Sequence, residues 1–169
     1  MKTQLKYSWI YNNQFDKEFS YKDLAILMTK TRQFITLFDK NINKILELIP
    51  KFTGYKWPEN DLIKFYIVNE KGHSFSDPLT LKYYENNKLM FVILIHELAH
   101  YNINYFIKDS SEREQVMDLI AYYVCKELKI DIKKELEFLE SIRKKQNKNF
   151  KKINFDLEKN NLRYYLERK

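Results

Sequence analysis

Apolar residues recur at intervals of three and four along residues 21–49, which is the spacing of one face of an α-helix. Ser20 and Asp23 form an approximate capping box at the start of this stretch, and Pro50 is expected to end it. One or two helices can fill the stretch. Residues 39–43 are rich in Asp and Asn, so a break is expected there.

Two other stretches have the pattern of strands. Residues 5–11 alternate with a period of two, which predicts a half-buried strand followed by a loop over 12–19. Residues 62–68 are β-branched and aromatic, and 79–84 again alternate, so both are expected to be strands. The segments 52–60 and 69–78 contain all of the glycine and most of the proline in the chain, and they predict connecting turns.

The most apolar run in the chain, residues 89–95, leads directly into the sequence His-Glu-Leu-Ala-His at 96–100. Asn86 or Asn87 can cap a helix that carries both. Further helices are expected from about 110 to 129, over 131–145, and as a short segment within 153–169. The pattern predicts an α+β fold in one domain of residues 1–169. A small twisted sheet would pack on the motif helix and the next helix, with an N-terminal helix, a core over about 21–130 and a helical C-terminal extension over about 131–169.

The H-E-x-x-H motif has the spacing of a metal site. His96 and His100 are four residues apart, so a helix presents both imidazoles on one side to a single ion. Glu97 is positioned to take a proton from a water on that ion. The alternative is a helix with two hydrogen-bonded histidines and a solvated glutamate. Metal binding is the favoured interpretation, because burying three polar side chains at the end of a core helix is unfavourable unless they have partners.

A catalytic zinc site usually has three protein ligands and keeps a fourth position for water. The extension H-E-x-x-H-x-x-G-x-x-H is excluded, because Ile103 and Phe106 occupy its last two positions. Glu114 on the following helix is the expected third ligand. Asp118, four residues later on the same face, is expected to accept a hydrogen bond from a ligating histidine.

The third ligand has alternatives. Ser111 and Glu114 are spaced as a capping box, which would give Glu114 a purely structural role, but Asp109 and Glu112 form an equally good box. Glu112 as the ligand, and Asp118 as a direct ligand, are the other possibilities.

Together these motifs resemble the gluzincin zinc metallopeptidases, and the short chain is similar to their small members, the minigluzincins. The likeness covers about residues 62–128. It implies peptide-bond hydrolysis with one Zn²⁺ bound by His96, His100 and Glu114, with Glu97 as general base and acid and Asp118 orienting a histidine. It also implies that the strand 79–84 is a sheet edge on which a peptide or protein substrate pairs, and that a C-terminal segment can lie over the site in a latent form.

Two features depart from the resemblance. Only 13 residues separate His100 from Glu114, which requires a tight connection. Gluzincins also commonly use a Tyr or His to stabilise the oxyanion. The chain has 13 tyrosines, so the sequence does not identify the one that would stabilise the oxyanion. His73 is another candidate for this role, and is otherwise expected to be an exposed residue of a turn.

Composition adds a second candidate function. The net charge is +7, and residues 126–169 hold 14 basic and 8 acidic residues. Residues 143–152 have six basic residues and no acidic one, so a nucleic-acid-associated protein with a regulatory metal is the main alternative. An inactive, metal-binding form of the peptidase is a third.

Composition also bears on location and excludes some classes. The 44% apolar share excludes a disordered chain, and two glycines exclude a glycine-rich phosphate loop. The single cysteine, Cys125, cannot form an internal disulfide, which suits a reducing compartment, and it is expected in the core. Residues 1–14 have no apolar leader pattern and the run 89–95 is too short to cross a bilayer, so a cytoplasmic protein with no membrane partner is expected.

Overall fold

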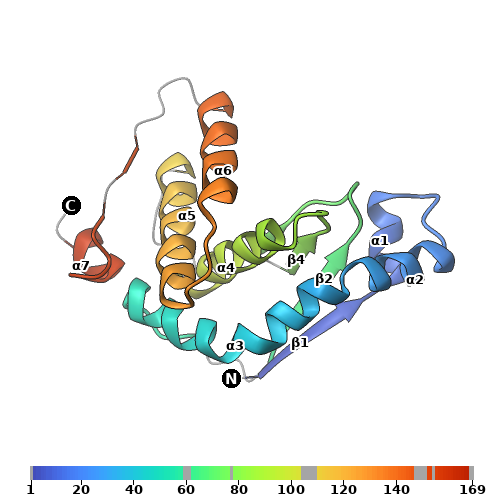
Figure 1. The fold of residues 1–169 in the computed structure, drawn as a ribbon, viewed down its shortest axis with the longest axis horizontal. Coiled ribbons are helices and arrows are strands. Elements are labelled where there is room, and N and C mark those ends of the chain that lie inside the picture. The colour runs from blue at the N-terminus through green and yellow to red at the C-terminus, as the bar shows by residue number, and fades with distance from the viewer. Residues whose placement is uncertain are drawn as a thin grey trace.

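The computed structural model describes residues 2–58, 62–76, 78–103, 110–146, 152–153 and 155–167, and has the expected α+β fold (Figure 1). The elements along the chain are β1 (Lys2–Tyr7), α1 (Trp9–Phe15), α2 (Tyr21–Lys30), α3 (Arg32–Thr53), β2 (Leu62–Val68), β3 (Phe75–Ser76), β4 (Leu79–Lys82), α4 (Asn87–Ile103), α5 (Ser110–Glu127), α6 (Lys133–Gln146) and α7 (Leu162–Leu166). α3 runs beside the sheet, α4 crosses the middle of the molecule, and α5 and α6 rise from it.

The strands of the described residues form one mixed sheet in the order β1-β2-β4-β3. β2 pairs in parallel with both β1 and β4, and β3 pairs antiparallel with β4. The prediction that 79–84 is a sheet edge is therefore wrong. β3, which lies within the expected turn 69–78, covers the outer side of β4 by pairing Phe75 with Thr80 and Ser76 with Leu79.

The prediction of a strand over residues 5–11 is wrong in its second half. β1 ends at Tyr7, and Trp9 and Tyr11 lie in α1, as do the first residues of the expected loop 12–19. The cause is Ser8, whose side chain accepts a hydrogen bond from the backbone N–H of Tyr11 and caps the helix. Buried Asn12 then ties α1 to the end of β2 by donating to the Ile67 carbonyl.

The long helical stretch is divided at Thr31, not at 39–43. The Thr31 hydroxyl donates to the carbonyl of Leu27 and closes the end of α2. The capping box of Ser20 and Asp23 at the start of α2 is confirmed.

Pro50 does not end α3, which continues to Thr53 and finishes at Gly54 with a left-handed φ of +79°. Proline has no N–H to donate to the carbonyl four residues earlier, which here belongs to Leu46. The indole Nε1–H of Trp57 donates to that carbonyl instead, at 2.7 Å. The chain therefore folds back after Gly54 and repairs the hydrogen bond that Pro50 removes.

Substitution of Trp57 by phenylalanine is expected to lower the free energy of unfolding by about 1–2 kcal/mol, because it leaves the Leu46 carbonyl without this donor. Urea denaturation would measure it. In a Pro50→Ala background the alanine N–H can supply the missing hydrogen bond, so the same substitution should cost less. An equal cost in both backgrounds would contradict this account.

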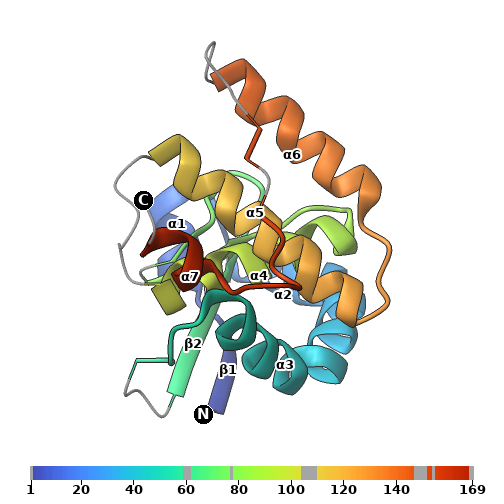
Figure 2. The ribbon, with the colours of Figure 1, turned by 90° about the vertical axis from the view of Figure 1, so that its left-hand side faces the viewer.

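The C-terminal part of the chain belongs to the same hydrophobic core as the rest. Ile132, Leu139, Leu157 and Leu162 are buried in the cluster that also contains the apolar residues of α3, α4 and α5. Figure 2 shows α7 beside α3 and α5, with α6 on the outside of α5. Among the described residues, no helix is both long and apolar enough to cross a membrane.

Candidate metal centre

Helix α4 brings the H-E-x-x-H motif into the interior. The Asn86 side chain, one of the two expected caps, accepts hydrogen bonds from the backbone N–H groups of Lys88 and Leu89. Twelve residues of the helix are buried, including His96 and Glu97, because α4 packs against the sheet, α3 and α5. The motif therefore lies on a rigid core element.

Three of the predicted site residues meet at one point. The Nε2 atoms of His96 and His100 are 3.0 Å apart. Glu114, from α5, places Oε1 3.1 Å from the Nε2 of His100 and Oε2 3.3 Å from the Nε2 of His96. In the described part of the chain, these three residues form the one group with its nitrogen or oxygen atoms close enough to hold a metal ion, and Glu112 is not in it.

The separations fit a small tetrahedral cation. Ligand atoms bonded to Zn²⁺ at about 2.0–2.2 Å lie roughly 3.3–3.6 Å from one another in a tetrahedron. The distances of 3.0–3.3 Å between the three side chains lie at or slightly below the lower end of this range. Two imidazoles and one carboxylate also form the donor set of known catalytic zinc sites, which leaves one position for water.

Asp118 lies behind the first histidine. The Nδ1–H of His96 donates to Oδ1 of Asp118 at 2.8 Å. This hydrogen bond fixes the ring orientation and directs Nε2 towards His100 and Glu114. The structure therefore places Asp118 where it orients an imidazole, one turn of α5 after Glu114.

The protonation states of the three residues differ. Burial opposes a charge on His96, but the carboxylates of Asp118, Glu114 and Glu97 outweigh it and raise the pKa of His96 to about 10. Burial lowers the pKa of His100. Burial by itself would raise the pKa of Glu114, but the contacts of Glu114 with the two histidines outweigh burial and hold this pKa well below its usual range. Without a metal at neutral pH, His96 is thus a charged imidazolium and His100 is neutral, so a metal must displace the proton on Nε2 of His96.

The affinity for Zn²⁺ is therefore expected to rise by at least about tenfold for each pH unit between about pH 7.5 and 8.5, because binding requires a neutral His96 and displaces its proton. His100 is already neutral in this range, and Glu114 is already ionised. Competition with a chromophoric chelator would measure the affinity, and calorimetry in buffers of different ionisation enthalpy would count the protons. An affinity that does not change with pH would contradict the assigned state of His96.

Glu97 lies between His96 and His100 on α4, and its exposed fraction is 9%. Burial is the main cause that raises the pKa of Glu97 to about 7, and the nearby Glu114 adds to it. A carboxyl group with a pKa near neutrality can both accept and return a proton. Tyr84, just after β4, lies close enough to feel this charge, since burial and the Glu97 carboxylate together raise the pKa of Tyr84.

Two residues near the site were not predicted. Tyr84 could not be distinguished from the other tyrosines by its sequence position. Arg143 of α6 contacts Glu114 and Asp118, although its sequence context is a basic run typical of a solvated face. His73 is exposed, and its ring packs edge-on against Phe15 of α1.

Some predictions about the site fall on residues outside the described ranges. The connection over 104–109, including Asp109 and Phe106, is among them, as are the side chains of Ser110 and Ser111. The choice between the two capping boxes of α5 therefore stays open. Cys125 is buried, as expected, and burial raises the pKa of its thiol to about 12.

Comparison of the chain with protein-family models, curated proteins and solved structures finds no match. The resemblance to gluzincins therefore stays a prediction based on motifs.

Proposed function

We propose that this protein is a zinc-dependent metallopeptidase that hydrolyses peptide bonds. The observation that carries the proposal is the convergence of His96, His100 and Glu114 from two helices, with a buried Glu97 beside them. A structural zinc site usually uses four protein ligands, whereas three ligands and an adjacent buried carboxylate are typical of hydrolysis. A reducing, cytoplasmic location is part of the proposal and is supported by the single cysteine, Cys125.

His96, His100 and Glu114 would hold the ion, which when bound lowers the pKa of water and polarises a peptide carbonyl. Glu97 takes a proton from the attacking water at a carboxylate oxygen and returns it to the nitrogen of the leaving amine. Asp118 keeps the Nδ1–H of His96 engaged, so the ring cannot turn away. The surrounding core residues of α4 exclude bulk water and strengthen these interactions.

The alternative of a nucleic-acid-associated protein receives little support from the basic run 143–152. Lys144 and Lys152 pair with Glu140, at 2.6 and 2.8 Å, and Arg143 turns towards the metal centre. These pairings reduce the positive charge that the run can offer to phosphates. The peptidase is therefore the function that the geometry supports best.

The test is metal analysis of the purified protein combined with a broad peptide-cleavage screen. We expect about one Zn²⁺ per chain, with cleavage that a chelator abolishes and added Zn²⁺ restores. A preparation that neither contains nor takes up zinc would reject the proposal, and zinc binding without cleavage of any peptide would favour the inactive alternative.

A further inference from the structure

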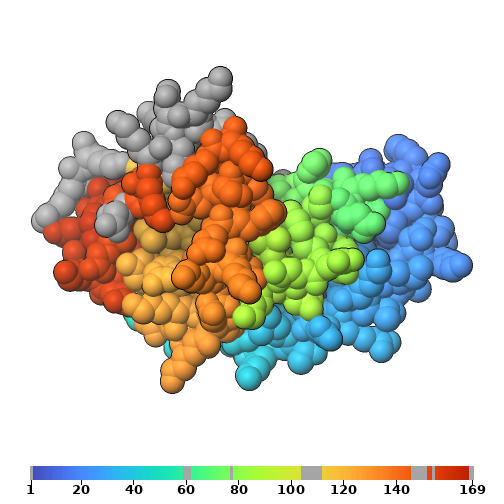
Figure 3. Space-filling model, turned by 45° about the horizontal axis from the view of Figure 1, so that its top comes forward, coloured from blue at the N-terminus to red at the C-terminus, as the bar shows by residue number. Residues whose placement is uncertain are grey.

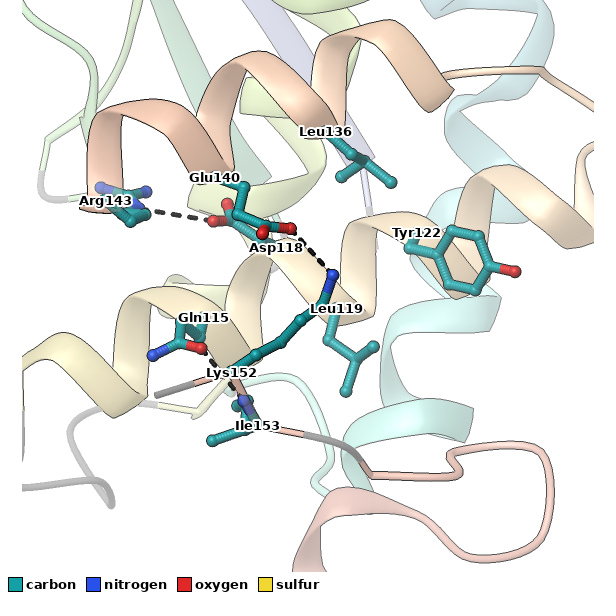
Figure 4. A pocket seen from close by; sticks show the side chains of 9 residues that line it. All are labelled: Gln115, Asp118, Leu119, Tyr122, Leu136, Glu140, Arg143, Lys152 and Ile153. Atoms are coloured by element: carbon teal, nitrogen blue, oxygen red, sulfur yellow. Dashed lines mark hydrogen bonds and ion pairs between the residues drawn. The ribbon is translucent and has the colours of Figure 1, made fainter. Parts of the chain in front are cut away.

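Helix α6 lies on the surface beside α5 and α4 (Figure 3) and sends one arginine inwards. The Nη2 of Arg143 is 2.9 Å from Oε2 of Glu114, and its Nε donates to Oδ2 of Asp118 at 3.4 Å. Figure 4 shows this side chain reaching from the end of α6 towards Asp118. The Arg143 side chain is 20% exposed, so both contacts are partly shielded from water.

The two carboxylates divide their oxygen atoms in a similar way. Glu114 directs Oε1 at His100 while Oε2 lies between Arg143 and His96. Asp118 directs Oδ1 at His96 and Oδ2 at Arg143. Oε1 of Glu114 and Oδ1 of Asp118 therefore contact the histidines and not the arginine. A planar guanidinium group that contacts the second oxygen of each carboxylate can hold the two carboxylates at a fixed spacing.

A cavity of about 280 Å³ lies between α5 and α6 beside these contacts, and its lining includes Leu119, Leu136 and Ile153 (Figure 4). Arg143 and Asp118 line the same cavity. Because the cavity interrupts the packing of side chains between the two helices, the polar contacts of Arg143 help to fix the position of α6 against α5.

We propose that Arg143 is a positioning residue for the metal centre: it holds Glu114 and Asp118 at the spacing at which they meet the histidines, and makes α6 part of the site. The inference rests on the metal site of the proposed function, but not on peptide cleavage. It assigns helix α6 of the C-terminal extension a role in forming the centre, in contrast to the latent role that the resemblance implies.

The test compares Zn²⁺ affinities of the wild type and Arg143→Lys, by competition with a chromophoric chelator. Lysine keeps the positive charge but loses the planar fork, so a change cannot come from charge alone. Loss of a residue that orients metal ligands typically weakens metal binding by about 10- to 100-fold, and we expect a loss in that range. The absorption spectrum of bound Co²⁺ should change as well, because the geometry of its ligands changes.

Two further variants make the result specific. Lys145→Gln removes one positive charge from an exposed position two residues along α6, and should leave both the affinity and the Co²⁺ spectrum unchanged. Arg143→Gln removes the charge at the site. Removing a cation by itself strengthens the binding of another cation, so weaker Zn²⁺ binding by this variant also reports lost positioning. Circular dichroism of each metal-free variant establishes that it is folded.

Unchanged Zn²⁺ affinity and Co²⁺ spectrum in Arg143→Lys would overturn the positioning role. Tighter binding in that variant would overturn it too, and would indicate that the arginine obstructs Glu114. A wild type that binds no Zn²⁺ rejects the metal centre and the role of Arg143 together. A wild type that binds Zn²⁺ but cleaves no peptide rejects only the peptidase.

Discussion

Replacement of Glu97 by glutamine is expected to lower kcat for peptide hydrolysis by about 10²- to 10⁴-fold, the range of a general acid–base group. Glutamine has nearly the same shape and fits the same buried place, but it can neither accept nor return the proton of the attacking water. Glu97 is outside the cluster of His96, His100 and Glu114, so the Zn²⁺ content should stay at the wild-type level. Steady-state kinetics with metal analysis on the same samples would measure both quantities.

The matched control is Glu127→Gln on α5, an exposed glutamate that pairs with Lys51. This control should keep wild-type activity. If Glu97→Gln hydrolyses peptides at the wild-type rate while zinc is bound, Glu97 is not the base. If it loses its zinc, the loss of turnover says nothing specific about proton transfer, and the placement of Glu97 outside the ligand set is wrong.

The second large effect is expected from His100→Ala, which removes one of the three side chains that we propose as metal ligands. Protein zinc sites bind with roughly 12 kcal/mol, so one of three ligands contributes about 4 kcal/mol, or a factor of about 10³ in Kd. The affinity for Zn²⁺ should fall by about this factor, and activity at limiting zinc should fall with it. Chelator competition measures the affinity directly, without need of a substrate.

His73→Ala is the matched control, because it removes the exposed histidine of the turn and should leave zinc binding unchanged. Glu114→Gln and Glu112→Gln extend the test to the two candidate third ligands. We expect only the first of these to weaken binding. Full zinc occupancy in His100→Ala would remove the proposed centre, and a loss confined to Glu112→Gln would transfer the ligand role to Glu112.

The central part of the fold could be predicted because its patterns are strong. The apolar run before His96 and the spacing of the apolar positions in α5 each allow one interpretation, and the structure has both helices. The segment 5–11 was ambiguous, because Trp9 and Tyr11 fit an alternating strand and a capped helix equally well. The hydrogen bond from Tyr11 to Ser8 decided the outcome. Thr31 was missed for a similar reason, since its hydroxyl competes locally with the helical backbone.

The cluster of His96, His100 and Glu114 could be predicted from spacing, because the two histidines share one helix and the glutamate lies near the start of the next. Arg143 could not be predicted from spacing to the motif, since its approach depends on how α6 packs. A signal was nevertheless present: Arg143 follows Leu136 by seven residues and buried Leu139 by four, and so falls on the inward side of α6. A charged residue on that side of a helix indicates a buried partner.

The rate at which Cys125 reacts with alkylating reagents reports how often the folded core opens. Cys125 is the single thiol of the chain, lies fully buried on α5, the helix that carries Glu114, and stays protonated because its pKa is raised to about 12. Alkylating reagents attack the thiolate, so labelling requires α5 to separate from the core. Any cation that stabilises the folded state should slow this labelling in proportion to its occupancy, which gives a readout of loading in crude mixtures without a chromophore or substrate.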